Sequence, residues 1–156
     1  MFLNKDFRDL LETFNAHSVR YLIVGGYAVG FHAQPRATND LDLWIGTNPE
    51  NAEAVYRALA VFGAPLHQVT AQDFEAEGYW YSFGNPPFRI DLLMSVSGLA
   101  FEDAWRNRLD VRLGELTVPL ISMDDLIVNK SSAGRTRDLA DLEDLQRARA
   151  ANPEQS

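Results

Sequence analysis

Apolar and polar positions recur with a helical period near both ends of the chain, and short apolar runs lie between them. Residues 4–16 place apolar side chains at i, i+3, i+4 and i+7, which predicts an amphipathic helix. Residues 22–24 are a continuous apolar run, as expected of a strand that is buried on both faces. The apolar stripe of the first helix consists of Phe7, Leu10, Leu11 and Phe14.

Glycine and proline divide the rest of the chain into further elements. The segment 66–78 is predicted to be a loop, although residues 72–76 are compatible with a short helical turn. Gly25 and Gly26 predict a turn between the first strand and the next helix. The other predicted strands are 40–45, 79–83, 88–94, 111–113 and 116–121, and the other predicted helices are 27–33, 49–62, 99–108, one that starts at 123, and 137–149.

This order of elements predicts an α+β fold (α/β in the broad sense), with a mixed β-sheet flanked by helices. A length of 156 residues with 46% hydrophobic and 23% charged residues suits one soluble domain with its own core. We expect residues 1–150 to form this domain and 151–156 to be a frayed tail.

Composition also limits the compartment and the partners. The chain has no cysteine, which excludes disulfides and thiolate-bound metal sites. The first helix mixes charged and apolar residues, unlike a signal peptide, and no apolar run approaches the length of a membrane span, so a cytoplasmic location is expected. The net charge of −8 disfavours a broad electrostatic grip on nucleic acid but leaves room for a local basic site.

Three carboxylates are the first candidates for chemistry. Asp40 and Asp42 stand at i and i+2 of one predicted strand, so they share a face and repel each other by about 2–3 kcal/mol at an effective dielectric of about 20. Asp91 lies between Ile90 and Leu92 in a later strand that can pair beside them. Three oxygen ligands suit Mg²⁺ or Mn²⁺. Alternatively, Asp40 is a cap or turn residue and Asp91 a surface residue of a hairpin.

Gly25 and Gly26 are candidates for phosphate binding. They follow a buried strand and precede a helix, whose first N–H groups are free to bind phosphate oxygens. The alternative is a tight packing turn between strand and helix. The dinucleotide pattern G-x-G-x-x-G is absent, which weakens a Rossmann interpretation.

The combined motif is more specific than its parts. Val24-Gly25-Gly26, then thirteen residues, then Asp40-Leu41-Asp42, and later Ile90-Asp91-Leu92, resembles the signature of the DNA polymerase β-like nucleotidyltransferase superfamily over about residues 20–95. The resemblance implies the nucleotidyltransferase fold, a bound NTP and divalent metal. It also implies that the two glycines hold the triphosphate, that Asp40 and Asp42 ligate both metal ions, and that Asp91 binds the catalytic metal and helps to activate the acceptor.

A second group of residues narrows the resemblance. Arg36-Ala-Thr38-Asn-Asp40-Leu-Asp42 and the later Lys130, Arg135, Asp138 and Asp141 are similar to small bacterial nucleotidyltransferases. These include toxins of abortive-infection-type toxin–antitoxin systems and lincosamide and aminoglycoside nucleotidyltransferases. The resemblance implies that Arg36, Thr38 and Lys130 contact the nucleotide, for which ATP is one candidate.

The residues themselves leave alternatives open for these charged positions. Arg36 precedes the acids on a loop, where it is either a phosphate contact or a solvated arginine. Lys130 is either a phosphate contact or part of a surface salt bridge with Asp125 or Asp138. Asp138 and Asp141 share a helix face, which reads most simply as a solvated charged face.

Aromatic residues are concentrated in the predicted hairpin that delivers Asp91. Strand alternation puts Tyr79, Tyr81 and Phe83 on one face and Trp80 on the other. One face could stack a base or an acceptor ring, although core packing is the simpler explanation.

These patterns predict a metal-dependent nucleotidyltransferase that transfers a nucleoside monophosphate from an NTP to a hydroxyl acceptor. The acceptor is open: RNA such as tRNA, a protein side chain or a small molecule. The competing hypotheses are a non-catalytic protein of the same fold that acts by binding a toxin–antitoxin partner, and a nucleotide sensor without turnover. The small core also leaves room for a homo-oligomer or a partner subunit that completes the acceptor site.

Overall fold

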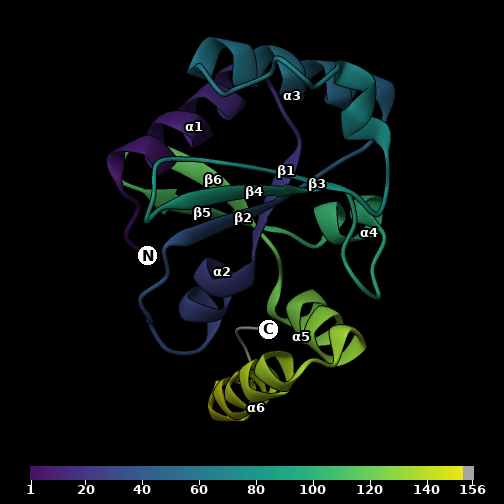
Figure 1. Ribbon diagram of the computed structural model, residues 1–156. Coiled ribbons are helices and arrows are strands. Elements are labelled where there is room, and N and C mark those ends of the chain that lie inside the picture. Colours follow the sequence, from purple (N-terminus) through teal and green to yellow (C-terminus); the bar gives the residue numbers. More distant parts are fainter. Residues whose placement is uncertain (153–156) are drawn as a thin grey trace.

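A six-stranded mixed sheet forms the centre of the computed structural model, in which residues 1–152 are described (Figure 1). The strand order is β3-β4-β2-β1-β6-β5. β2 runs parallel to β4, and β1 runs parallel to β6, whereas the other neighbours are antiparallel. The strands are β1 (Tyr21–Val24), β2 (Asp40–Ile45), β3 (Trp80–Phe83), β4 (Arg89–Leu93), β5 (Leu109–Leu113) and β6 (Leu116–Leu120).

Helices cover both faces of this sheet. In Figure 1, α1 and α3 lie above the sheet, and α2, α5 and α6 lie below it. The helices are α1 (Lys5–Ala16), α2 (Gly25–His32), α3 (Pro49–Phe62), α4 (Phe101–Arg106), α5 (Met123–Ala133) and α6 (Thr136–Ala151), together with the 3₁₀ helix η1 (Ala71–Glu75). The predicted class, a mixed α and β fold with helices around a mixed sheet, is confirmed.

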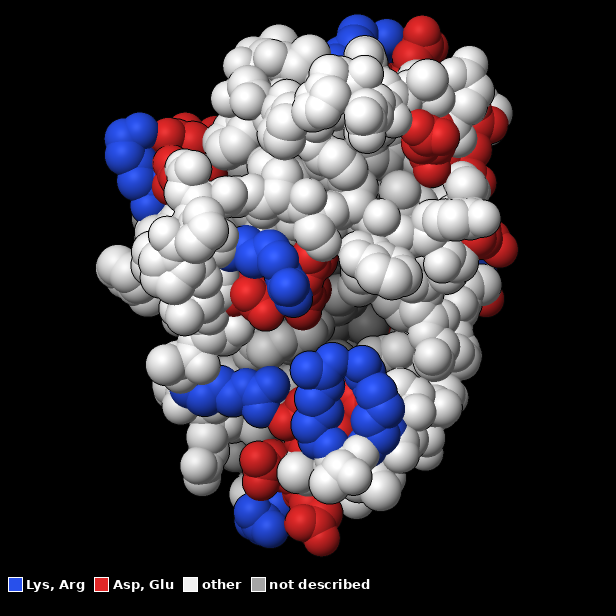
Figure 2. Space-filling model, in the orientation of Figure 1, with Lys and Arg blue, Asp and Glu red and all other residues white. Residues whose placement is uncertain are grey.

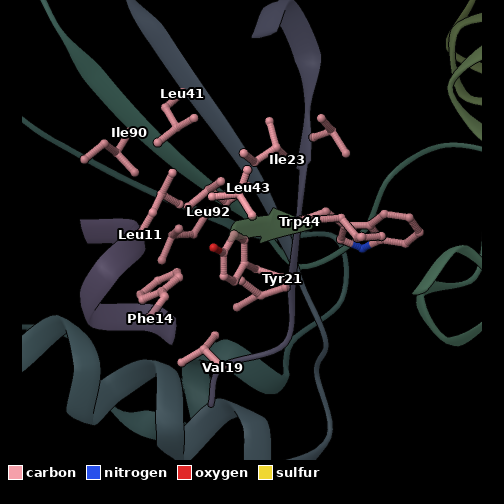
Figure 3. Close-up of a cluster of buried hydrophobic side chains, with 14 of the residues drawn as sticks. Leu11, Phe14, Val19, Tyr21, Ile23, Leu41, Leu43, Trp44, Ile90 and Leu92 are labelled. Carbon is pink, nitrogen blue, oxygen red and sulfur yellow. The ribbon is translucent and has the colours of Figure 1, made fainter. Parts of the chain in front are cut away.

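The main core lies between the sheet and the two helices α1 and α3. Successive side chains of a strand point to opposite faces, so the odd-numbered residues of β1 and β2 face α1. Leu11 and Phe14 of α1 point toward them and are fully buried (Figure 3). The strand residues that join this cluster are Tyr21, Ile23, Leu41, Leu43, Ile90 and Leu92. The even-numbered residues of β1 and β2, and the odd-numbered residues of β4, are thereby left to face α2, α5 and α6.

Three predictions about local structure need correction. Gly25 and Gly26 do not form a turn before a helix, because α2 begins at Gly25 itself. The segment predicted as a loop, 66–78, contains η1, in agreement with the alternative of a short helical turn at 72–76, and its start is stabilised by a capping box between Thr70 and Asp73. The predicted tail, 151–156, begins inside α6, and residues 153–156 lie outside the described part of the chain.

The aromatic hairpin divides between core and surface. Tyr81 packs edge-on against Phe74 of η1, and Phe83 is buried, as core packing predicted. Tyr79 and Trp80 are 68% and 67% exposed, so core packing is wrong for both of them. None of the helices in residues 1–152 has the length and apolar character needed to cross a bilayer.

Candidate active site

The three predicted acids meet on one face of the sheet. β2 and β4 are adjacent and parallel, and their register sets Asp42 beside Asp91 and Asp40 beside Arg89. Neighbouring residues in register point to the same face, which here is the face opposite α1. The predicted pairing of the two acid-bearing strands is therefore confirmed.

Arg89 lies between two of the acids. Its Nη2 is 3.3 Å from Asp40 Oδ2 and 3.2 Å from Asp91 Oδ2, so one guanidinium bridges carboxylates of two strands. Asp91 is further held by Ser82 of β3, whose hydroxyl donates a hydrogen bond to Asp91 Oδ1. Asp91 is buried, which rules out the alternative of a surface hairpin residue.

Asp42 is the acid with the most perturbed titration. Burial, followed by the negative charge of Asp91 and a hydrogen bond with it, raises the pKa of Asp42 to about 7. Asp40 adds to this rise, and Arg89 opposes it. The site therefore concentrates more negative charge than its own arginine neutralises.

The start of α2 lies against the acids. Gly25 has φ = +67°, and a Cβ at this position would lie 2.0 Å from Asp42 Oδ2. A Cβ at Gly26 would lie 3.2 Å from the hydroxyl oxygen of Thr38. Thr38 Oγ1 is itself 3.3 Å from the Asp40 backbone nitrogen, which donates to it. The glycines thus bring the free N–H groups of a helix start next to the carboxylates.

A cleft of about 710 Å³ opens in front of these residues, with a basic wall facing the acids. Figure 2 shows this face, with acidic groups beneath a basic one at the centre and a dense group of basic side chains below a hollow. The basic residues that line the cleft are Arg36, Arg89, Lys130, Arg135 and Arg137. The sheet side contributes Val24, Gly25, Gly26, Thr38, Asp40, Asp42, Asp91 and Leu93.

The basic wall is fixed by a buried charge network. Lys130 Nζ is 2.9 Å from Asp141 and 3.3 Å from Asp138, and Arg36 Nη1 is 2.6 Å from the other oxygen of Asp141. Arg135 pairs with Asp138 at 2.6 Å. The network joins the loop before β2 to α5 and α6, although Arg36 and Asp141 are 105 residues apart.

Because this network is buried, its residues are not the surface or solvated groups that the sequence suggested. Lys130, Asp138 and Asp141 are 8%, 0% and 6% exposed, so neither a surface salt bridge nor a solvated charged face describes them. Asp138 is a partner of Lys130, as the alternative anticipated, but Asp125 instead accepts a hydrogen bond from Asn107. Arg36 is not simply a solvated loop arginine, because Asp141 holds it against the cleft.

The aspartates of the network are held in their charged form. Burial by itself would raise the pKa of Asp138, but hydrogen bonds from Arg135 and Lys130 outweigh it and leave the pKa lowered. Burial likewise opposes the hydrogen bonds from Arg36 and Lys130 to Asp141, and the pKa of Asp141 is again lowered. Asp138 and Asp141 therefore hold three of the cations that line the cleft: Arg36, Lys130 and Arg135.

Three residues of the site had not been assigned to it from the sequence. Arg89 was detectable, because position i−2 on a strand shares the face of Asp91. Ser82 depends on the hairpin register, which pairs it with Asp91. Arg137 belongs to a basic run near the C-terminus and, unlike the other cations of the cleft, makes no ion pair within residues 1–152.

The three acids have the ligand atoms that a divalent cation prefers, but their side chains are not arranged around a common metal position. All donors are carboxylate oxygens, the ligands that Mg²⁺ and Mn²⁺ prefer. Within residues 1–152, no group of three Asp, Glu or His side chains is gathered as a ready metal site, and the Arg89 guanidinium bridges Asp40 and Asp91 instead. The fit therefore requires the carboxylates to turn away from Arg89.

Comparison with known proteins gives a family and a fold. A family model described as "Nucleotidyltransferase of unknown function (DUF6036)" matches residues 3–148. A search among curated proteins found no match.

Two solved structures share the fold. The lincosamide antibiotic adenylyltransferase LnuA with bound lincomycin superposes with a TM-score of 0.58 at 16% identity, over 94% of this chain and 98% of that one. TM1012 of Thermotoga maritima, described as a candidate nucleotidyltransferase, has a TM-score of 0.58 at 12% identity, over 95% of this chain and 91% of that one. At these identities, the likeness establishes the nucleotidyltransferase fold that the motifs predicted.

Proposed function

The chain belongs to the DUF6036 family of nucleotidyltransferases of unknown function, and from this premise we propose that it transfers a nucleoside monophosphate from an NTP to a hydroxyl acceptor with Mg²⁺ or Mn²⁺. One observation carries the proposal. Asp40, Asp42 and Asp91 share one face of adjacent strands, and a cleft separates them from a wall of cations. Nucleotidyl transfer requires both parts, because a triphosphate must be held while charge develops at its α-phosphorus.

Each wall has a role in this reaction. Asp91 takes the proton of the acceptor hydroxyl, whose oxygen forms a bond to the α-phosphorus while the bond to pyrophosphate breaks. Asp40 and Asp42 with Asp91 would hold the divalent cation, which supplies neutralisation of charge on the phosphates when bound. The opposite wall receives pyrophosphate, and Arg137 is the cation of this wall that makes no ion pair within residues 1–152.

The nucleotide is proposed to enter with its triphosphate toward α2. The N–H groups at Gly25 and Gly26 bind phosphate oxygens, and Thr38 shapes the loop beside them. Arg36 and Lys130 line the cleft and add positive charge, while their aspartate partners keep them in place. ATP is the first NTP to test, since the fold neighbour LnuA is an adenylyltransferase.

The test is a transfer assay with purified protein. Each α-labelled NTP is supplied with Mg²⁺ or Mn²⁺ and with total tRNA, a protein extract or lincomycin, and label transfer and pyrophosphate release are measured. Asp42→Ala should remove transfer. Asp124→Ala is the matched control, because this aspartate lies on α5 and pairs with Arg149, outside the cleft.

Two results would lead away from catalysis. Transfer that is unaffected by Asp42→Ala contradicts the proposed site. Binding of NTP without transfer to any acceptor favours the nucleotide sensor, and absence of both favours a protein that acts by binding a partner.

A further inference from the structure

We propose that Trp80 is the stacking platform for a planar ring of the acceptor and thereby selects acceptors with an aromatic or heteroaromatic group. The inference rests on the proposed function, because it assigns the acceptor side of the same site. Three observations carry it: the face on which Trp80 lies, its exposure, and the direction from which the acceptor must approach.

The register of the hairpin places Trp80 on the face that carries the acids. β3 is antiparallel to β4, with Ser82 opposite Asp91 and Trp80 opposite Leu93. Directly opposed residues of an antiparallel pair point to the same face. The hydrogen bond from Ser82 to Asp91 confirms this for one pair, and Leu93, which faces Trp80, lines the cleft.

Trp80 differs from the other tryptophans in its exposure and in its lack of an aromatic or cationic partner within residues 1–152. Trp44 is 2% exposed and contacts Phe101, and Trp105 stacks with Phe101 and lies under the guanidinium of Arg108. Trp80 is 67% exposed and makes no aromatic or cation–π pair within residues 1–152. Trp80 itself does not line the cleft, but its strand partner Leu93 does, and a large apolar ring left in water next to such a residue can gain energy by covering a ligand.

The geometry of in-line displacement indicates that the acceptor, and not the nucleotide, lies beside Trp80. The attacking and leaving oxygens stand on opposite sides of the α-phosphorus. In the proposed reaction pyrophosphate leaves toward the cations of the loop before β2, of α5 and of the start of α6, so the acceptor approaches from the other side. That side is the edge of the sheet formed by β4 and β3, where Asp91, Ser82 and Trp80 follow one another.

The spacing along the sheet suits one acceptor molecule. Strands lie about 4.8 Å apart, and residues i and i+2 are about 6.6 Å apart, so the Cα of Trp80 lies roughly 8 Å from that of Asp91. A ring stacked on the indole can therefore carry a hydroxyl that reaches Asp91 within the same nucleoside-sized molecule. Stacking of this kind contributes about 1–3 kcal/mol per ring.

Tryptophan fluorescence tests the platform without requiring turnover. The protein is loaded with Mg²⁺ and α,β-methylene-ATP, and is titrated with adenosine or cytidine as planar probes. Lincomycin serves as a hydroxylated probe without an aromatic ring. We expect saturable quenching by the nucleosides, little change with lincomycin, and loss of the quenching in Trp80→Phe. If the nucleosides do not change the tryptophan fluorescence, or if the quenching is retained in Trp80→Phe, the proposal is overturned.

Kinetics with an acceptor found by the transfer assay provide the second measurement. Trp80→Ala should raise the KM for a planar acceptor about 5-fold or more, with the KM for NTP and kcat nearly unchanged, and Trp80→Phe should restore most of the loss. Tyr79→Ala is the matched control, because Tyr79 is equally exposed but precedes β3, outside the register that sets Trp80 opposite Leu93. A rise in the KM for NTP instead would assign Trp80 to the nucleotide base and overturn the acceptor role.

The two proposals fail separately. If wild-type protein transfers no label but nucleosides still quench Trp80, transferase activity is refuted and the platform stands as a binding site. If transfer occurs but Trp80→Ala leaves every KM unchanged, the proposed function stands and the platform is refuted.

Discussion

Gly25 at the start of α2 is in direct contact with Asp42 of β2, and no side chain fits between them. A Cβ on Gly25 would lie 2.0 Å from Asp42 Oδ2, and the backbone of Gly25 has φ = +67°. Two independent constraints therefore require glycine here: the left-handed backbone and the missing space. The second constraint belongs to the site, because it sets how closely the start of α2 approaches the carboxylates.

Replacement of Gly25 should separate these two constraints. Gly25→Ala should lower the free energy of unfolding by about 1–3 kcal/mol and abolish transfer, because Asp42 must move. Gly114→Ala is the matched control, since Gly114 has φ = +68° but no atom within 4 Å of the added Cβ. It should show only the backbone strain, with activity retained. Denaturant unfolding and the transfer assay measure the two effects, and equal loss of activity in both variants contradicts a role for the contact.

The raised pKa of Asp42 predicts an unusual pH dependence of stability in the metal-free protein. Between about pH 4 and pH 7, the folded protein keeps the Asp42 proton that the unfolded chain releases. The unfolded state then binds fewer protons, so the contribution of Asp42 to stability decreases as pH rises through this range. At pH 8 in EDTA, Asp42→Asn should therefore be more stable than wild type by about 1–2 kcal/mol, and at pH 4 the difference should vanish.

Denaturant unfolding of both proteins from pH 4 to pH 8 measures this effect. Comparison with Asp42→Asn isolates Asp42 from Asp138 and Asp141, whose lowered pKa values act in the opposite direction and at lower pH. A difference that does not vary with pH would contradict the raised pKa.

The sequence alone was sufficient to identify the three acids and to predict that they lie on one face of the sheet. Strand alternation with apolar neighbours fixed Asp40, Asp42 and Asp91, because a buried sheet leaves only one face for carboxylates. Alternation could not tell which helices cover each face of the sheet. It set Trp80 apart from Tyr79 and Tyr81, but only the packing of η1 against Tyr81 determines which aromatic ring is buried.

The charge network shows where pattern reasoning fails. Asp138 and Asp141 have charged neighbours, so their helix face reads as solvated. Their burial depends on Lys130 and on Arg36, which is more than a hundred residues away. The spacing of apolar and polar residues along the sequence cannot predict such a contact, because it forms only when α6 docks against the loop before β2.

Arg89 is predicted to compete with the divalent cation. Its guanidinium bridges Asp40 and Asp91, so a bound metal must first displace two partly exposed ion pairs. Such pairs are worth about 1 kcal/mol or less each, and Arg89→Ala should therefore tighten Mn²⁺ binding about 3-fold to 10-fold. Isothermal titration calorimetry or the electron paramagnetic resonance of free Mn²⁺ provides the affinity.

A control distinguishes this competition from a change in overall charge. Arg106→Ala removes an exposed arginine whose ion pair is with Asp103 of the same helix, outside the cleft. It should leave the Mn²⁺ affinity unchanged. Weaker Mn²⁺ binding in Arg89→Ala would instead mean that Arg89 positions the carboxylates for the metal.

Loss of Lys130 should destabilise the protein far more than loss of an exposed lysine. Its ammonium is buried between Asp138 and Asp141, so Lys130→Met leaves two buried carboxylates with one cation fewer. Removal of one partner from such a buried pair typically costs about 3–5 kcal/mol, and Arg36 and Arg135 reduce this to about 2–4 kcal/mol here. Lys5→Met is the control, because its pair with Asp9 lies on the surface, with the two side chains 86% and 41% exposed, and its loss should be undetectable. Urea unfolding at pH 7 measures both variants, and similar midpoints for the two would contradict the network.

The loss of stability in Lys130→Met should also shrink as acid protonates the two aspartates. Their lowered pKa values contribute stability only at pH values where both carboxyl groups are ionised.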